Sequence, residues 1–126
     1  MSGRILIADD DRSILETFEH HLGRSGYEVA TAASAEGALE VLPAFEPALV
    51  ITDVRMPGMD GIELCRQIRA ASPTQNTPVL ILSARGDAEA VQQGMAAGAD
   101  DYLSKPILHH DLISKVRELL KMNGTG

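Results

Sequence analysis

Acidic side chains follow two short apolar runs in this sequence, and both positions are suited to phosphoryl chemistry. Residues 48–51 lead to Asp53, and residues 5–8 run directly into Asp9 and Asp10. A carboxylate at the C-terminal end of a buried parallel strand lies where open α/β sheets bind their ligands. Carboxylates gathered in one place repel each other unless a cation intervenes, and Mg²⁺ prefers such oxygen ligands. Since a carboxylate can also accept a phosphoryl group, Asp53 is the leading candidate for chemistry.

Two further strand ends add a hydroxyl and a cation. Residues 79–82 form a wholly apolar run that ends in Ser83, and a shorter strand at 102–103 leads to Lys105. Because the carboxyl ends of parallel strands meet at one edge of a sheet, Ser83 and Lys105 are expected beside Asp53. Catalysis of phosphoryl transfer consists mostly of positioning and charge neutralisation. Lys105 and the Ser83 hydroxyl would therefore hold some phosphoryl oxygens, and a metal ion would bridge others.

Helical periodicity separates the strands. Apolar residues recur at helical spacing, with Ser, Asp, Gly or Pro near the expected helix ends. The predicted helices span about 12–24, 35–42, 61–71, 87–97 and 107–122. Pro43 is predicted to close the second helix, and Val91 and Met95 are expected to be the few large apolar groups of the fourth.

Five strands alternating with five helices predict an α/β domain with helices on both faces of a parallel sheet. Segment 27–32 alternates apolar and polar residues, which is typical of an exposed edge strand. The strand order 2-1-3-4-5 places this segment at an edge and the fully apolar strands inside. The predicted fold is therefore a doubly wound (βα)5 fold of the flavodoxin-like type.

The composition indicates one acidic domain. The 126 residues suit a single domain with a core at about 3–122 and a tail at 123–126 that has no anchoring residues. A net charge of -7, with only two Phe, two Tyr and no Trp, argues against direct nucleic-acid binding. With no apolar run of the roughly 20 residues that cross a bilayer and no signal-peptide pattern, we expect no membrane association and a cytoplasmic protein. Cys65, the only cysteine, is expected to be a small buried thiol.

Four motifs taken together resemble the receiver domain of bacterial two-component response regulators. The motifs are ILIADDD, ITDVRMPGMDG, ILSA and YLSKP, and the resemblance covers about residues 3–122. The resemblance implies that Asp53 is phosphorylated by a sensor histidine kinase or a phosphotransfer protein. It also implies that helix 4, strand 5 and helix 5 then present a changed face to an output domain or a downstream protein. The cognate kinase cannot be read from one sequence, and the surface of the helix predicted at 12–24, near Ile14, Leu15 and Phe18, is a place to look for its docking.

The resemblance also implies a magnesium site. Asp9 or Asp10 would hold Mg²⁺, directly or through water, together with Asp53 and the backbone carbonyl of Arg55.

The same resemblance implies roles for the remaining strand-end residues. Ser83 would be the hydroxyl switch residue, Tyr102 the aromatic rotamer switch, and Lys105 the residue that binds the phosphoryl group. The Lys105–Pro106 bond is expected to be cis. In the mechanism that we hypothesise, phosphorylation draws the Ser83 hydroxyl toward the phosphoryl oxygens, and Tyr102 turns inward into the vacated space.

Two arginines follow the site residues at matching positions. Arg55 lies two residues after Asp53, and Arg85 lies two residues after Ser83. The hypothesis is that both flank the mouth of the site and set the lifetime of the phosphoryl group by holding phosphate or obstructing the hydrolytic water. The alternative is that both are solvated surface groups.

Two alternative functions stay open. A phosphohydrolase of similar topology also uses an Asp nucleophile with Mg²⁺, but such enzymes need a second Asp at the position that Arg55 occupies here. A receiver-fold docking module that acts without phosphorylation is the other alternative, and the complete set of acids, hydroxyl and lysine argues against it. The expected protein is thus a regulatory domain that catalyses only its own phosphorylation and slow dephosphorylation.

The output cannot be chosen from the sequence. Helix 4 carries Val91, Gln92 and Gln93 where the winged-helix transcription subfamily usually has basic residues, so we lean away from that mode of dimerisation. A phosphorylation-dependent dimer otherwise stays open. The adjacent pairs His20-His21 and His109-His110 are interpreted as surface groups, and Asp100-Asp101 as solvation of a loop.

Overall fold

The fold is a five-stranded parallel β-sheet, described for residues 3–122 in a computed structural model. Its strands are β1 (Arg4–Ala8), β2 (Glu28–Ala32), β3 (Leu49–Asp53), β4 (Val79–Ser83) and β5 (Asp101–Ser104). Its helices are α1 (Arg12–Arg24), α2 (Ala35–Phe45), α3 (Gly61–Ala70), α4 (Ala88–Ala96) and α5 (His109–Met122), with a short 3₁₀ turn η1 (Ser72–Thr74). No helix within residues 3–122 combines the length and apolar character needed to cross a membrane. The tail predicted at 123–126 lies outside the described residues.

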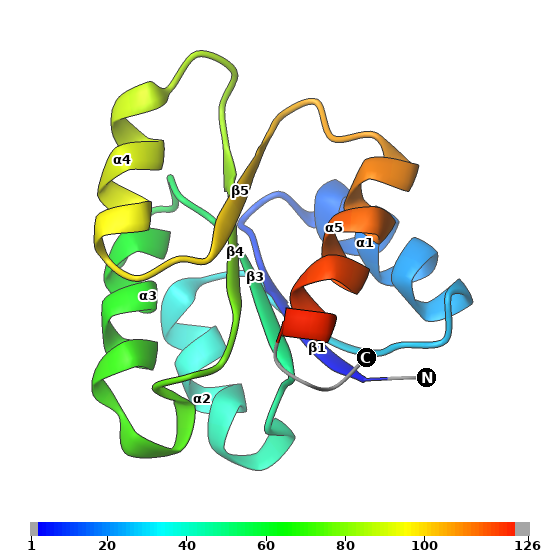
Figure 1. Ribbon diagram of the computed structural model, residues 1–126, viewed down its shortest axis with the longest axis horizontal. Coiled ribbons are helices and arrows are strands. Elements are labelled where there is room, and N and C mark those ends of the chain that lie inside the picture. Colours follow the sequence, from blue (N-terminus) through cyan, green and yellow to red (C-terminus); the bar gives the residue numbers. More distant parts are fainter. Residues whose placement is uncertain (1–2, 123–126) are drawn as a thin grey trace.

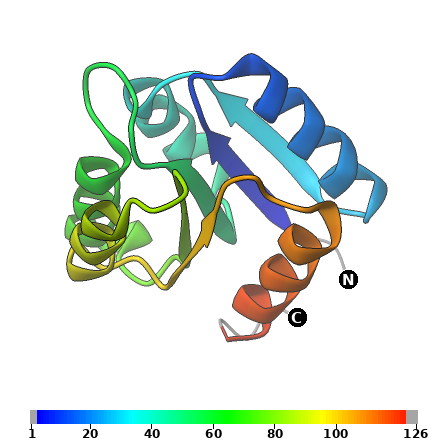
Figure 2. The ribbon, with the colours of Figure 1, turned by 90° about the horizontal axis from the view of Figure 1, so that it is seen from above.

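The strand order is β2-β1-β3-β4-β5, which confirms the predicted doubly wound flavodoxin-like topology. Helices α2, α3 and α4 cover one face of the sheet, and α1 and α5 cover the other (Figure 1). Seen from above, neighbouring strands are rotated relative to one another, as expected for a twisted sheet (Figure 2).

The sheet separates two apolar cores. Successive side chains of a strand point to opposite faces, so Leu6 and Ala8 join the core beneath α2, α3 and α4, whereas Ile5 and Ile7 join the core beneath α1 and α5. Cys65 is fully buried in the first of these cores, as expected, and burial raises the pKa of its thiol.

The strands differ in burial, and their register aligns the strand ends that carry the site. All five residues of β3 and of β4 are buried, whereas β2 keeps an exposed first residue and a half-buried middle and lies at one edge of the sheet, which confirms that it is an edge strand. In the register of the sheet, Ala8 lies beside Thr52, and Asp53 lies beside Leu82. Asp9, Asp53 and Ser83 therefore lie within about one residue of one another along the same edge of the sheet and can share one site.

The prediction that Pro43 closes the second helix is wrong, because α2 continues to Phe45. Proline removes only the hydrogen bond that its own N–H would donate, and Pro43 is exposed and lies in the last turn, so only two further helical residues follow it. The helix ends where Glu46 adopts the left-handed conformation, with φ 50°, and donates its N–H to the Leu42 carbonyl at 3.0 Å.

Helix α4 packs through small residues, which differs from the expected anchoring by Val91 and Met95. Its buried residues are Ala90 and Gly94, whereas Val91 is half-buried and the Met95 side chain is 39% exposed. A Cβ on Gly94 would overlap Cδ1 of Ile81 in β4. The helix therefore lies close to the sheet along a narrow contact and has few large side chains to hold it.

The two histidine pairs meet, which the interpretation as separate surface groups did not anticipate. His21 near the end of α1 and His109 at the start of α5 have ring centroids 4.0 Å apart, and His20 lies 5.4 Å from His21. Burial lowers the pKa of His21, and the neighbouring charges of His109, His20 and Arg24 lower it further. The pairs come from opposite ends of the chain, so sequence spacing carries no sign of this contact.

Asp100 and Asp101 do more than solvate their loop. Asp100 Oδ2 accepts hydrogen bonds from the backbone N–H of Val79 and from Arg69, both at 2.8 Å. Asp101 Oδ2 accepts one from Lys115 Nζ at 2.6 Å. The first carboxylate therefore links α3 to the start of β4, and the second fastens β5 to α5.

Candidate functional site

Three carboxylates converge at the ends of β1 and β3, as the sequence predicted. Asp9, Asp10 and Asp53 each offer a carboxylate oxygen, and these oxygens lie within 4.8 Å of one another. Asp9 is fully buried and Asp53 is 7% exposed, whereas Asp10 is exposed. The cluster thus has a buried floor and an open side through which a small ligand can enter.

Lys105 completes the cluster from the loop after β5. Its Nζ donates to Asp53 Oδ2 at 3.1 Å and forms an ion pair with Asp9 Oδ2 at 3.6 Å. The peptide bond that follows, to Pro106, is cis, as expected. Burial by itself would lower the pKa of Lys105, but the two carboxylates together outweigh it, and the pKa is raised. The ammonium group of Lys105 therefore stays charged and is held at the Asp53 carboxylate.

Asp9 retains an unsatisfied oxygen. Its Oδ1 accepts the backbone N–H of Asp11 at 2.9 Å, but Oδ2 is buried without a hydrogen-bond partner among residues 3–122. Burial is the main cause of a raised pKa at Asp9, and the negative charge of Asp53 adds to it. A divalent cation would satisfy this oxygen and relieve the repulsion, because Mg²⁺ takes carboxylate oxygens and keeps several of its waters. Asp9, Asp10 and Asp53 therefore fit a divalent cation.

The backbone around Asp53 is fixed from two sides. Val54 donates its N–H to the Leu82 carbonyl at 3.1 Å and accepts the N–H of Gly61 at 2.9 Å. A Cβ on Gly61 would overlap the carbonyl oxygen of Asp53, so only glycine lets α3 begin this close to the strand. The buried hydroxyl of Thr52, whose part the sequence did not reveal, donates to the same carbonyl at 2.9 Å. The Asp53 carboxylate thus extends from a rigid strand end.

Ser83 ends β4 next to this cluster and is 1% exposed. Its Oγ lies 3.4 Å from Oγ of Ser104 in β5, and its carbonyl accepts the N–H of Lys105 at 2.8 Å. Among residues 3–122 the hydroxyl makes one long contact, and the backbone of the same residue positions the lysine.

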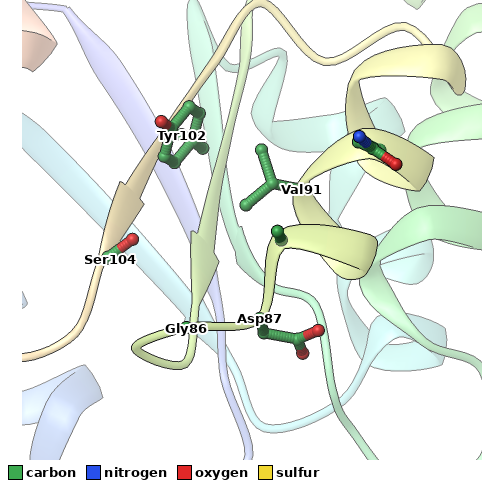
Figure 3. Close-up of a pocket in the computed structure, with 7 residues that line it drawn as sticks. Gly86, Asp87, Val91, Tyr102 and Ser104 are labelled. Carbon is green, nitrogen blue, oxygen red and sulfur yellow. The ribbon is translucent and has the colours of Figure 1, made fainter.

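Tyr102 lies on β5 with its side chain 43% exposed. Together with Ser104 it lines one side of a groove of about 290 Å³, whose other side is formed by Gly86, Asp87 and the α4 residue Val91 (Figure 3). The side chain of Val91 points from α4 toward β5 in this view. Tyr102 is thus in the outward position from which the hypothesised inward turn would start.

The two arginines are placed differently from the carboxylates and the lysine. Arg55 forms an ion pair with Asp87, at the start of α4, instead of extending to Asp53. Arg85 is exposed and has no hydrogen bond or ion pair within the described chain. The sequence marks Asp87 as the first residue of a helix, but it cannot show a pairing between residues 32 positions apart.

Comparisons with known proteins agree with this fold and site. The model of the response regulator receiver domain matches residues 5–117. Response regulator MprA of Mycobacterium ulcerans is 40% identical over 121 residues, which are 96% of this chain and 51% of that protein. This chain spans about half the length of the curated relatives it matches.

Two solved structures match over nearly their whole length. A protein of Chloroflexus aurantiacus assigned as a response regulator is 40% identical, with a TM-score of 0.92 over 96% of this chain and 99% of that one. The chemotaxis response regulator CheY4 of Vibrio cholerae is 34% identical, with a TM-score of 0.89 over 94% of this chain and 99% of its own.

Fold and site thus define a two-component signalling module, with an acidic cluster and a lysine at the carboxyl edge of a doubly wound sheet. The chain belongs to the response regulator receiver domain family.

Proposed function

We propose that this domain accepts a phosphoryl group on Asp53 from a sensor histidine kinase or a phosphotransfer protein, in an Mg²⁺-dependent reaction. The observation that supports this most directly is the hydrogen bond of 3.1 Å from Lys105 Nζ to Asp53 Oδ2, made beside two further carboxylates. A carboxylate oxygen of Asp53 would attack the phosphorus of the donor's phosphohistidine, so that the O–P bond of an acyl phosphate forms as the P–N bond breaks and the donor imidazole leaves. The buried strand end and the lysine fix this carboxylate, and such positioning is most of what phosphoryl transfer asks of a protein.

The surrounding groups take the roles that the family resemblance implies. Asp9 and Asp10, with Asp53 and the carbonyl of Arg55, would hold Mg²⁺, which supplies positive charge to phosphoryl oxygens when bound. Lys105 would pass from the carboxylate to a phosphoryl oxygen. The Ser83 hydroxyl, held by one contact of 3.4 Å, costs little to reorient toward the same group.

The consequence would be a changed surface at α4, β5 and α5. Movement of Ser83 would leave space for Tyr102, which now lies outward, and the groove between α4 and β5 would change shape. A partner protein or an output domain would bind this face, and phosphorylation-dependent dimerisation would be one such interaction. The matched relative NtrX of Brucella abortus shows that such a segment can be 27% of a longer chain.

The remaining parts of the proposal are inferred from the amino-acid sequence. We propose a single domain over residues 1–126, acting in the cytoplasm as a regulatory unit without direct nucleic-acid or membrane contact. Arg55 and Arg85 would set the lifetime of the phosphoryl group. Docking without phosphorylation and hydrolysis of an external phosphoester are the alternatives, and the guanidinium of Arg55 stands where a phosphohydrolase needs an acid.

Incubation with a small phosphodonor, such as acetyl phosphate, with and without Mg²⁺ tests the proposal. Intact mass spectrometry should show one added phosphoryl group, which is lost in Asp53→Asn and in the presence of a chelator. The matched control is Asp111→Asn, because Asp111 is an exposed carboxylate on α5 outside the cluster. Incorporation that persists in Asp53→Asn, or that ignores the chelator, would overturn the assignment.

A further inference from the structure

The side chain of Arg55 connects the loop after Asp53 to the start of α4. Its Nε donates to Asp87 Oδ2 at 3.1 Å and its second terminal nitrogen donates to Oδ1 at 3.3 Å. This is the two-pronged arrangement in which a guanidinium holds a carboxylate most specifically. The Arg55 side chain is 60% exposed and that of Asp87 only 20%, so the acid is the more constrained partner.

Asp87 serves the helix with the same oxygen. Its Oδ1 also accepts the N–H of Ala90 at 3.2 Å, which caps the first turn of α4, and its carbonyl accepts the N–H of Val91 at 3.2 Å. The hydrogen bond with Arg55 is the main cause of both a lowered pKa at Asp87 and a raised pKa at Arg55. One carboxylate therefore joins the capping of α4 to the loop that follows Asp53.

The loop that carries Arg55 is held more rigidly than the helix α4 that Asp87 caps. On the loop side, Val54 makes two backbone hydrogen bonds and Met56 is buried, so the backbone at Arg55 is fixed between them. On the helix side, the residues buried within α4 are only Ala90 and Gly94. Because so little apolar surface holds this helix, an ion pair at its first turn restrains it more than an equal pair would restrain α1 or α3.

We propose that the Arg55–Asp87 pair is a tether that holds the start of α4 in the unphosphorylated protein and is released when Arg55 turns to a phosphoryl group on Asp53. The release half rests on the proposed function. Arg55 lies two residues after Asp53, and two residues of extended chain span at most about 7 Å. The long Arg55 side chain can therefore reach Asp53 as well as Asp87. Phosphorylation adds negative charge and three acceptor oxygens at Asp53. Asp87 thereby acts as a positioning residue that determines where Arg55 lies.

Hydrogen exchange of the Ala90 and Val91 amides in the unphosphorylated protein tests the tether itself. Arg55→Ala and Asp87→Asn should each speed this exchange by about two- to fivefold, the factor expected for an exposed ion pair. Asparagine still caps a helix well, so Asp87→Asn removes the charge and keeps the capping hydrogen bond. The double variant should exchange no faster than either single variant. Additive effects would overturn the tether, whether or not the protein is phosphorylated.

A matched variant controls for the loss of an arginine. Arg66 forms an ion pair with Glu63 within α3 at 3.3 Å, so Arg66→Ala removes a comparable exposed pair that does not involve α4. Exchange at Ala90 and Val91 should stay at the wild-type rate in this variant. An equal increase there would mean that any lost surface pair loosens α4, and the specific role of Arg55 would be excluded.

The same measurement with a phosphodonor and Mg²⁺ tests the release, with intact mass recorded on each sample. Phosphorylated wild-type protein should exchange at the rate of unphosphorylated Arg55→Ala, and phosphorylation of Arg55→Ala should add no further increase. A phosphorylated wild type with unchanged exchange would overturn the release. An intact mass without the phosphoryl group would instead count against the proposed function, and the double-variant comparison would still decide the tether.

Discussion

At the scale of single residues, Asp9 combines functional value with a cost in stability. Its Oδ2 is buried without a hydrogen-bond partner among the described residues, and its pKa is raised chiefly by burial. We expect Asp9→Asn to increase the free energy of unfolding by about 1 kcal/mol without Mg²⁺, since it removes the charge from an unsatisfied buried oxygen. Urea denaturation at pH 7 measures this. A decrease would show that the attraction to Lys105 outweighs the cost of burial.

The same substitution should abolish stabilisation by magnesium. For the wild type, Mg²⁺ at a hundredfold above its Kd should add about 2.7 kcal/mol to the free energy of unfolding, because the ion binds only the folded cluster. Asp9→Asn should show little of this gain. The comparison uses thermal or urea unfolding with Mg²⁺ and with chelator, and an equal gain in both proteins would place the metal elsewhere.

The pH dependence of stability gives an independent check on Asp9. Its folded pKa is raised above the ordinary value of 3.8, so the folded protein binds this proton more readily than the unfolded chain. The contribution of Asp9 to the free energy of unfolding should therefore fall as the pH rises from near 3.8 through the folded pKa. As the pH rises across this range, the free energy of unfolding of the wild type should fall further relative to that of Asp9→Asn.

The roles of individual residues were predictable where a strand end determined them. Asp9, Asp10, Asp53 and Lys105 come together because parallel strands place their carboxyl ends at one edge, which sequence order already implies. Asp87 could not be recognised in this way. Its pairing with Arg55 depends on where a loop and a helix end meet in space, and residue spacing does not encode that.

At the scale of elements, the contact between α4 and β4 depends on a glycine. Gly94→Ala should lower the free energy of unfolding by about 1–3 kcal/mol, because a Cβ would overlap the buried side chain of Ile81. This loss exceeds the gain of about 0.5–1 kcal/mol that alanine brings to a helix. Chemical denaturation measures the change. An increase would mean that Ile81 moves aside without cost.

Gly23 in α1 provides the matched control for this substitution. A Cβ there would have no atom within 4 Å. Gly23→Ala should therefore raise the free energy of unfolding by about 0.4–1 kcal/mol. Opposite signs at two helical glycines would separate the effect of packing from that of helix propensity.

The elements were predicted best where apolar runs and capping residues coincided. Strands β1, β3 and β4 and helix α1 lie where the sequence placed them. Two predictions about helices differ from the structure. Helix α2 tolerates Pro43 because the proline falls in its last turn, and α4 buries Ala90 and Gly94 instead of its larger side chains. Close approach to a sheet favours small residues, and hydrophobicity patterns assign them little weight.

At the scale of the whole molecule, the contact between His21 and His109 joins the first helix to the last. Burial and neighbouring positive charges lower the pKa of His21 below its ordinary value of 6.5. The unfolded chain therefore binds this proton more readily, so the free energy of unfolding should fall as the pH drops from about 6.5 through the folded pKa. His21→Gln should weaken this dependence.

Thermal unfolding at several pH values between 5 and 8 measures the effect, in the range where histidine titrates. His110→Gln is the control, because His110 lies beside Asp111 and does not take part in the contact between the helices. If both variants keep the full pH dependence of the wild type, the histidine contact does not cause it.

The division of the interior into two cores has a consequence for how the sequence can change. Ile68 belongs to the core that supports α4, and Ile113 belongs to the core that supports α1 and α5, with the sheet between them. Ile68→Val and Ile113→Val should each cost about 0.5–1.5 kcal/mol and combine additively to within about 0.5 kcal/mol. The residues of the two cores would then change independently during evolution, without compensating substitutions across the sheet.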